Sequence, residues 1–156
     1  MQNGDLITET THGFICANSG VDVSNVDGGS SAVLLPEDPD ASARRMMFAL
    51  RRALNVRVAV VIADTFGRPW REGLTEAAIG VAGLKPLRDY RRRRDPAGYR
   101  LHATAEAIAD ELASAAGLVC GKLERVPVCI IRGFVYDSGP GSAKSLIRTP
   151  SRDLFR

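Results

Sequence analysis

The residues best suited to chemistry begin with a carboxylate that directly follows an apolar run. Residues 56–63 (VRVAVVIA) are largely apolar on both faces of an extended chain, which predicts a buried strand that ends at Asp64. Thr65 places a hydroxyl beside this carboxylate, and such hard oxygen atoms are ligands that Mg²⁺ or Mn²⁺ accepts. The alternative is that Asp64 only caps a turn, and the local pattern leaves both interpretations open.

Two arginines follow this carboxylate in the segment DTFGRPWREG. Arg68 and Arg71 lie on either side of Pro69 and Trp70, the single tryptophan of the chain. An arginine fork binds a phosphate or carboxylate through two parallel hydrogen bonds, so both arginines are candidates for holding an anionic substrate. Taken alone, the pattern fits surface arginines packed beside an indole better than it fits a binding site.

Other polar residues give weaker signals. Asp22 and Asn25 in GVDVSN offer an acid and an amide to a metal or a nucleotide, although both residue types are common in turns. The glycine-rich segment 139–145 lacks the spacing of a phosphate-binding P-loop. The arginine run at 91–94 has no interleaved aromatic residues, which favours a solvated loop or the edge of an anionic substrate site over nucleic-acid binding.

The composition fits one soluble globular domain spanning residues 1–156. Charged residues make up 25% of the chain and the net charge is +3, too small to imply nucleic acid by itself. The three cysteines form no CxxC pair, so no zinc site or disulfide framework is predicted, and a reducing cytoplasm is the simplest location. Because no apolar run reaches the length of a membrane span, no membrane association is expected.

Two helices are expected from capping and periodicity. Residues 38–55 begin with a capping acid, Asp38, followed by a proline at the first helical position. Residues 104–122 begin at a capping Thr104 and end at Gly121. The first helix carries an apolar stripe that is expected to face the core, formed by Met46, Met47, Leu50, Ala53 and Leu54.

The remaining apolar segments are expected to be strands. These are residues 13–17, 31–36, 56–63 and 126–134, the last of them buried. Residues 72–87 fit a short helix and residues 88–100 a charged loop. Interspersed helices and strands predict the α+β class, with a mixed sheet and packed helices. The glycine fingerprint of a doubly wound dinucleotide-binding fold is missing.

Several longer segments resemble one family. GFICANSGVD, DTFGRPWREG, AIGVAGLKPLRDY, ADELASAAGLVCGK and GSAKSLIRTPSRDLFR are similar, in order and spacing, to the coenzyme F-420-0:L-glutamate ligase (gamma-glutamyl ligase) family. The resemblance covers nearly the whole chain, and the first two segments together are highly specific. It implies the gamma-glutamyl-ligase-like fold and a homodimer of intertwined subunits.

The activity implied by this resemblance is GTP-dependent amide bond formation in deazaflavin cofactor biosynthesis. GTP phosphorylates the terminal carboxylate of coenzyme F-420-0, the amine of L-glutamate attacks the acyl phosphate, and GDP and phosphate leave. A triphosphate substrate requires a divalent metal, here Mg²⁺ or Mn²⁺, and two ions are expected.

The same resemblance assigns roles to individual residues. Asp22, Asp64 and Thr65 are expected to hold metal, and Asn25 to contact GTP. Asp64 is also the expected catalytic centre, together with the two arginines of DTFGRPWREG.

The chain departs from the family pattern in sequence and in length. Lys122 stands where many members carry Glu or Gln, so Lys122 is expected to contact the nucleotide and Glu124 to serve the second metal. Arg92 replaces the usual glycine of DYRG, a change expected to affect acceptor recognition. Family members carry about eighty to ninety more residues before ITETTHGF, enough to complete a domain. The fold is therefore expected to be incomplete. Three explanations are left open: one half of a split enzyme that needs a separate chain, a wrongly assigned start, or a truncated, non-catalytic paralogue acting as a binding or assembly module.

Overall fold

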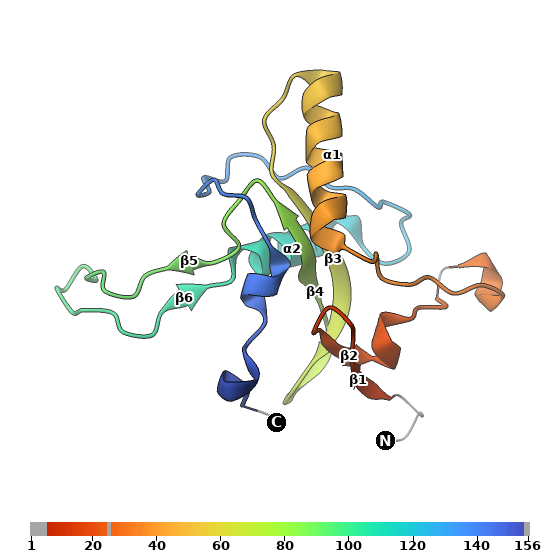
Figure 1. Ribbon diagram of the computed structural model, residues 1–156, viewed down its shortest axis with the longest axis horizontal. Helices are drawn as coiled ribbons and strands as arrows, with labels where there is room; N and C mark the ends of the chain where they lie inside the picture. Colours follow the sequence, from red (N-terminus) through yellow and green to blue (C-terminus); the bar gives the residue numbers. More distant parts are fainter. Residues whose placement is uncertain (1–5, 25, 155–156) are drawn as a thin grey trace.

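The computed structural model describes residues 6–24 and 26–154. A long antiparallel hairpin of β3 (Val60–Arg68) and β4 (Arg71–Ala82) lies at its centre. Two helices, α1 (Pro39–Leu54) and α2 (Ile108–Cys120), pack against this hairpin (Figure 1). Two shorter hairpins lie further out, β1 (Ile7–Glu9) with β2 (Ile15–Ala17) and β5 (Arg88–Asp89) with β6 (Ala105–Glu106).

The α+β class is confirmed, but the strands do not form one mixed sheet. Every strand pair in residues 6–24 and 26–154 is antiparallel, and the three pairs are separate two-stranded ladders. The strand expected at 13–17 is confirmed as β2. Short 3-10 turns complete the elements: η1 (Asn18–Gly20), η2 (Asp27–Gly29), η3 (Ala143–Leu146) and η4 (Pro150–Arg152).

Helix α1 forms as its local signals predict. The Asp38 side chain accepts a hydrogen bond from the Ala41 N–H at 2.8 Å, and Asn55 ends the helix in the left-handed conformation (φ 53°). The expected core stripe is wrong for much of its length, because Leu50 is 38% exposed and Leu54 is 63% exposed. Burial is concentrated in the first turns of the helix, which pack against β4, at Pro39, Asp40 and Ala43.

Two predicted element boundaries are corrected by the pairing of strands. The short helix expected at 72–87 is instead mostly strand β4, because pairing with β3 and burial of residues 78–82 outweigh a weak helical periodicity. Helix α2 begins at Ile108 rather than at Thr104, because residues 105–106 pair with β5. Its predicted end at Gly121 is confirmed.

Two apolar segments that were expected to be strands are not. Residues 126–134 contain no strand, and Ile130 is 73% exposed rather than buried. Residues 31–36 make a single bridge, between Val33 and Asp22. An apolar sequence supplies strand propensity but not a partner, and in the described part of the chain neither segment has a neighbouring strand along its length.

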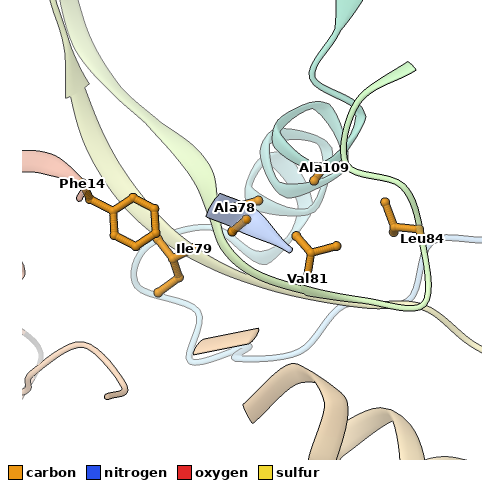
Figure 2. Close-up of a cluster of buried hydrophobic side chains, with 7 residues drawn as sticks. Phe14, Ala78, Ile79, Val81, Leu84 and Ala109 are labelled. Atoms are coloured by element: carbon orange, nitrogen blue, oxygen red, sulfur yellow. The ribbon is translucent and has the colours of Figure 1, made fainter. Parts of the chain in front are cut away.

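The hydrophobic core lies around strand β4 (Figure 2). Several of its side chains are small, which allows the backbones of β4, α2 and η3 to approach closely. Gly80 shows how close the approach is, because a Cβ atom there would clash with the Pro39 carbonyl. The buried cluster comprises Phe14, Ala78, Ile79, Val81, Leu84, Ala109 and Ala143.

A buried carboxylate joins three parts of this core. Asp40, 7% exposed, accepts hydrogen bonds at Oδ1 from the N–H groups of Val81 (2.8 Å) and Ala143 (3.0 Å). The Ser142 hydroxyl donates to Oδ2 at 2.6 Å. These bonds tie the first turn of α1 to β4 and η3, and so fix the helix against the hairpin that carries the candidate site.

Candidate functional site

Asp64 lies within strand β3 rather than at its end, which corrects the sequence prediction. In the antiparallel register Asp64 is opposite Ala77 and Thr65 is opposite Glu76. The strand continues as far as Arg68 because β4 supplies hydrogen-bonding partners on that side. The carboxylate is therefore held by a paired backbone, not by a loop at the rim of a parallel sheet.

A β-bulge sits directly before this carboxylate. Ile62 pairs with Gly80 while Ala63 pairs with Ala78, so Ile79 is the extra residue on β4. A bulge shifts the facing of every side chain that follows it in the ladder and increases the local twist. The bulge thus helps to determine which face of the hairpin presents Asp64.

The surroundings of Asp64 are half-buried and rich in negative charge. Burial raises the pKa of the Asp64 carboxyl, and the nearby carboxylates of Glu76 and Asp22 raise it further. A hydrogen bond from the Thr65 N–H to Asp64 Oδ1 (2.9 Å) and the ammonium group of Lys122 act in the opposite direction on this pKa. Asp22, Asp64 and Lys122 come from distant parts of the chain and are brought within electrostatic range of one another.

Asp22 is exposed and is held in its own loop. Its carboxylate accepts hydrogen bonds from the Ser24 N–H (2.7 Å) and the Ser24 hydroxyl (3.0 Å). These bonds lower the pKa of Asp22, and Lys122 lowers it further, so this carboxylate stays ionised. Main-chain hydrogen bonds with Val33 fix the position of the loop.

Glu76 is an acidic neighbour that no sequence motif identifies. The Thr65 hydroxyl donates a hydrogen bond to Glu76 Oε1 at 3.0 Å across the hairpin. Because successive strand residues face opposite sides, Thr65 presents its hydroxyl to Glu76 rather than beside the Asp64 carboxylate. Glu76 is 12 residues beyond Asp64 in the sequence, and only the β3–β4 register shows that the two residues are neighbours in the hairpin.

Arg68 and Arg71 occupy the tip of the hairpin. They pair with each other across the turn formed by Pro69 and Trp70, and the Arg68 guanidinium donates to the Glu72 carbonyl at 3.0 Å. Arg68 follows Asp64 by four positions along the strand, about 13 Å along the backbone. Arg68 also lines a cavity of about 340 Å³ between the hairpin and α2, which Glu76 lines as well. The structure therefore places the arginines beyond the carboxylates, on the same hairpin.

The other sequence-predicted residues lie after α2 or outside the described chain. Lys122 is exposed and close enough to affect both aspartates electrostatically. The Glu124 carboxylate accepts a hydrogen bond from the Leu123 N–H at 2.8 Å and does not join the Asp22–Asp64 region in this arrangement. Asn25 lies outside the described residues.

The donor set suits a hard divalent cation. Two carboxylates and a hydroxyl are oxygen ligands of the type that Mg²⁺ and Mn²⁺ prefer, and the carboxylates of Glu76 and Asp22 make the surroundings of half-buried Asp64 negative. Within residues 6–24 and 26–154, no three His, Cys, Asp or Glu side chains are already gathered at ligand distance. The oxygen-bearing residues around Asp64 thus fit a hard cation in chemistry.

Comparison with known proteins gives this geometry a context. A family model described as F420-0:Gamma-glutamyl ligase matches residues 1–133. The chain belongs to this family. The expected resemblance is thereby confirmed, over the segments that carry Asp22, Asp64 and Lys122.

Three coenzyme F420:L-glutamate ligases illustrate the similarity. The protein of Methanothermobacter thermautotrophicus is 48% identical over 154 residues, which are 97% of this chain and 61% of that relative. The protein of Methanopyrus kandleri is 47% identical over 156 residues, 97% of this chain and 62% of that relative. The protein of Methanocaldococcus jannaschii is 46% identical over 152 residues, 97% of this chain and 60% of that relative. The chain spans about three fifths of the length of these relatives.

None of the described helices is suited to span a membrane. Neither α1 nor α2, nor any other helix among the described residues, combines the length and the apolar character needed to cross a bilayer.

Proposed function

We propose that this chain is the carboxylate-bearing part of a GTP-dependent ligase that adds L-glutamate to coenzyme F-420-0. The observation that carries the proposal is the approach of Asp22 and Lys122 to Asp64, from three separate segments. Family membership supplies the class of reaction, because the relatives are named coenzyme F420:L-glutamate ligase. The proposed reaction forms an amide through an acyl phosphate and releases GDP and phosphate.

In this proposal the oxygen ligands hold divalent ions, either Mg²⁺ or Mn²⁺. Asp22 and Asp64 provide the main ligands, and Thr65 is proposed to join them once its hydroxyl leaves Glu76. Glu124 is proposed to reach the second ion after its loop turns away from the Leu123 N–H. When bound, such ions neutralise the negative charge of a triphosphate during phosphoryl transfer. Asp64 is suited to this task because the β3–β4 ladder fixes its backbone before any ligand arrives.

The basic residues are proposed to hold the anionic substrates. Lys122 presents an ammonium group beside the two aspartates, where it can contact phosphate oxygens of GTP, and Asn25 is proposed to contact the same nucleotide. Arg68 and Arg71, further along the hairpin, are proposed to clamp a carboxylate or phosphate of the acceptor or of the glutamate.

Metal binding by the chain itself tests the carboxylate assignment without requiring turnover. Titration of Mn²⁺ in the presence of GTP, followed by electron paramagnetic resonance of free Mn²⁺, is expected to show binding that Asp64→Asn weakens at least tenfold. The matched control is Asp137→Asn, because Asp137 is exposed and outside the hairpin. Equal Mn²⁺ affinity in wild type and Asp64→Asn would contradict the ligand role.

Turnover is tested by supplying the part of a related ligase that this chain does not match. The chain is mixed with a polypeptide that supplies the two fifths of the relatives' length not matched here, and GDP release is measured with GTP, F-420-0 and L-glutamate. We expect GDP release that depends on all three substrates and that Asp64→Asn abolishes. GDP release that persists in Asp64→Asn would refute the catalytic assignment.

A second candidate function is that of a non-catalytic binding or assembly module. The large exposed surface area of the chain favours it. The chain exposes 11783 Å², whereas a compact monomer of 16.8 kDa exposes about 7,700 Å². The difference, about 4,000 Å² on this chain alone, exceeds what one partner contributes to an obligate interface of about 2,000–5,000 Å² in total. Large apolar side chains contribute to this surface, among them Phe48, Leu54, Leu118 and Ile130.

We therefore propose that the chain works in a complex, as a homodimer or with a separate chain that completes the fold. Sedimentation velocity at several concentrations distinguishes these arrangements, because a homodimer forms from this chain alone. A stable monomer in both the absence and the presence of the complementary polypeptide would exclude both. A cytoplasmic location is part of the proposal, since all three cysteines are free thiols.

A further inference from the structure

A basic arm projects from the body of the molecule. Residues 88–106 run out along β5, turn, and return along β6, on the side away from β1 and β2 (Figure 1). Main-chain hydrogen bonds extend the pairing beyond the two short strands, from the Tyr90 N–H to the Thr104 carbonyl (3.0 Å) and from the Arg92 N–H to the Leu101 carbonyl (2.8 Å). The arm is therefore an ordered hairpin, although it contributes no residue to the buried core.

The turn at the end of the arm is fixed by polar contacts. The Asp95 carboxylate accepts a hydrogen bond from the Tyr99 N–H at 2.8 Å, and the Arg94 guanidinium donates to the Gly98 carbonyl at 2.7 Å. Arg94 and Asp95 are thus used in holding the shape of the arm. Three further arginines are also engaged: the Arg88 guanidinium donates to the Val135 carbonyl at 2.8 Å, Arg91 is paired with Asp89, and the Arg93 guanidinium lies over the Tyr90 ring.

Positive charge is concentrated in this arm. Residues 88–102 contain six arginines and two aspartates, a net charge of +4, whereas the whole chain carries +3. The rest of the chain is therefore slightly negative. Like charges packed into one short hairpin repel one another, so the arm gains stability when a counter-charge binds.

The arm contains a cavity lined by several of these charges. Its volume is about 680 Å³, large enough for a small molecule, and its lining is Asp89, Arg91, Arg92, Arg100, Leu101 and His102. Arg91 is already paired, since its guanidinium donates to both carboxylate oxygens of Asp89 at 2.5–2.9 Å. This pairing lowers the pKa of Asp89 to about 2, so Asp89 stays ionised and offsets Arg91.

Two arginines in the cavity retain their full charge. In the part of the chain that the structure describes, neither Arg92 nor Arg100 has a carboxylate within ion-pair distance or a side-chain hydrogen bond. Arg92 also adopts a left-handed backbone (φ 71°), a conformation in which a residue other than glycine is uncommon and somewhat strained. A strained arginine with an unpaired guanidinium in a cavity is a reason to look for a bound anion.

We propose that the arm cavity binds a small polyanion, a molecule with at least two carboxylate or phosphate groups, through Arg92 and Arg100. Guanidinium forks bind both kinds of group through paired hydrogen bonds, and His102 adds a ring nitrogen. The site is separate from the Asp22–Asp64 region, because no residue of that region lines the cavity. Arg92 is also the residue whose replacement of glycine was expected to affect acceptor recognition, but the site follows from the geometry and charge of the arm and not from the proposed ligase activity.

Isothermal titration of the whole chain in EDTA, with pyrophosphate and separately with tricarballylate, tests this site. The decisive variant is Arg92→Gly with Arg100→Gln, because glycine keeps the left-handed backbone while removing the guanidinium. Loss of two exposed ion pairs is expected to weaken binding about tenfold. The matched control, Arg51→Ala with Arg52→Ala at the end of α1, removes the same charge and is expected to bind as wild type does.

A third variant is expected to strengthen anion binding instead of weakening it. Asp89→Asn removes the carboxylate that repels an anion and releases Arg91, so binding is expected to tighten about two- to fivefold. Binding of pyrophosphate alone would identify a phosphate ligand, binding of tricarballylate alone a carboxylate ligand, and both results support the site. The proposal is overturned if neither anion binds, if the control weakens binding equally, or if duplex DNA binds more tightly than both anions.

Discussion

Removal of the Asp40 carboxylate is expected to destabilise the whole fold. Asp40→Ala leaves the buried N–H groups of Val81 and Ala143 without an acceptor, in addition to freeing the Ser142 hydroxyl. Each orphaned buried group costs about 1–3 kcal/mol, so the free energy of unfolding should fall by about 2–6 kcal/mol. Asp40→Asn keeps an Oδ1 acceptor for both N–H groups and should cost only about 1–2 kcal/mol, mostly from weaker, uncharged hydrogen bonds.

Urea denaturation followed by circular dichroism measures this difference. With a slope of about 2 kcal/mol/M, the unfolding midpoint of Asp40→Ala should fall by about 1–3 M and that of Asp40→Asn by less than about 1 M. Asp137→Ala, on the surface, serves as the control and should leave the midpoint unchanged. If Asp40→Asn proves as destabilising as the alanine variant, or if neither shifts the midpoint, Asp40 does not act as the acceptor described here. Should Asp40→Ala fail to fold, the asparagine variant still decides, because its midpoint is predicted separately.

Two further predictions concern pH and oxidation. The Asp110 carboxyl is half-buried and its Oδ1 accepts a hydrogen bond from the Ala78 N–H at 2.9 Å. Burial raises the pKa of Asp110 in the folded chain above the ordinary Asp value of about 4. The contribution of Asp110 to folding stability is therefore lost as the pH rises from about 4 through the raised pKa. Asp110→Asn keeps the oxygen acceptor but cannot ionise, so the fall in the denaturation midpoint over this pH range should disappear. If the midpoint of the variant depends on pH as that of the wild type does, Asp110 is not the responsible group. Burial and the neighbouring Cys129 thiol raise the pKa of Cys120, so the two thiols lie near one another. Oxidation with diamide should therefore join them into a disulfide while Cys16, which is buried, stays reduced, as peptide mass mapping would reveal. Closing a ten-residue loop should add about 2.7 kcal/mol and raise the Tm by about 5–10 °C. A mixed set of disulfides, or a lower Tm, would count against that contact.

Local signals in the sequence placed α1 and the end of α2, but not the start of α2 or the strands. Asp38, Pro39 and Gly121 act within one turn of their own helix ends, whereas α2 begins one turn later than Thr104 because residues 105–106 pair with β5. A strand exists only beside a partner, and the partner is remote in sequence. This is why residues 71–82 became β4 despite a helical pattern, while residues 126–134, equally apolar, did not become a strand.

The sequence by itself determined the family of this protein and the acidic residues worth testing, because motif order and residue type are properties of the chain alone. Tertiary structure decided what surrounds those residues. The β3–β4 register placed Asp64 within a strand and brought Glu76 to Thr65, and it carried Arg68 to the far end of the hairpin. Folding likewise buried Asp40 as an acceptor for three donors and gathered the unpaired arginines of the arm around one cavity. Distances and burial between remote segments depend on how the chain packs, and no pattern within a single segment encodes them.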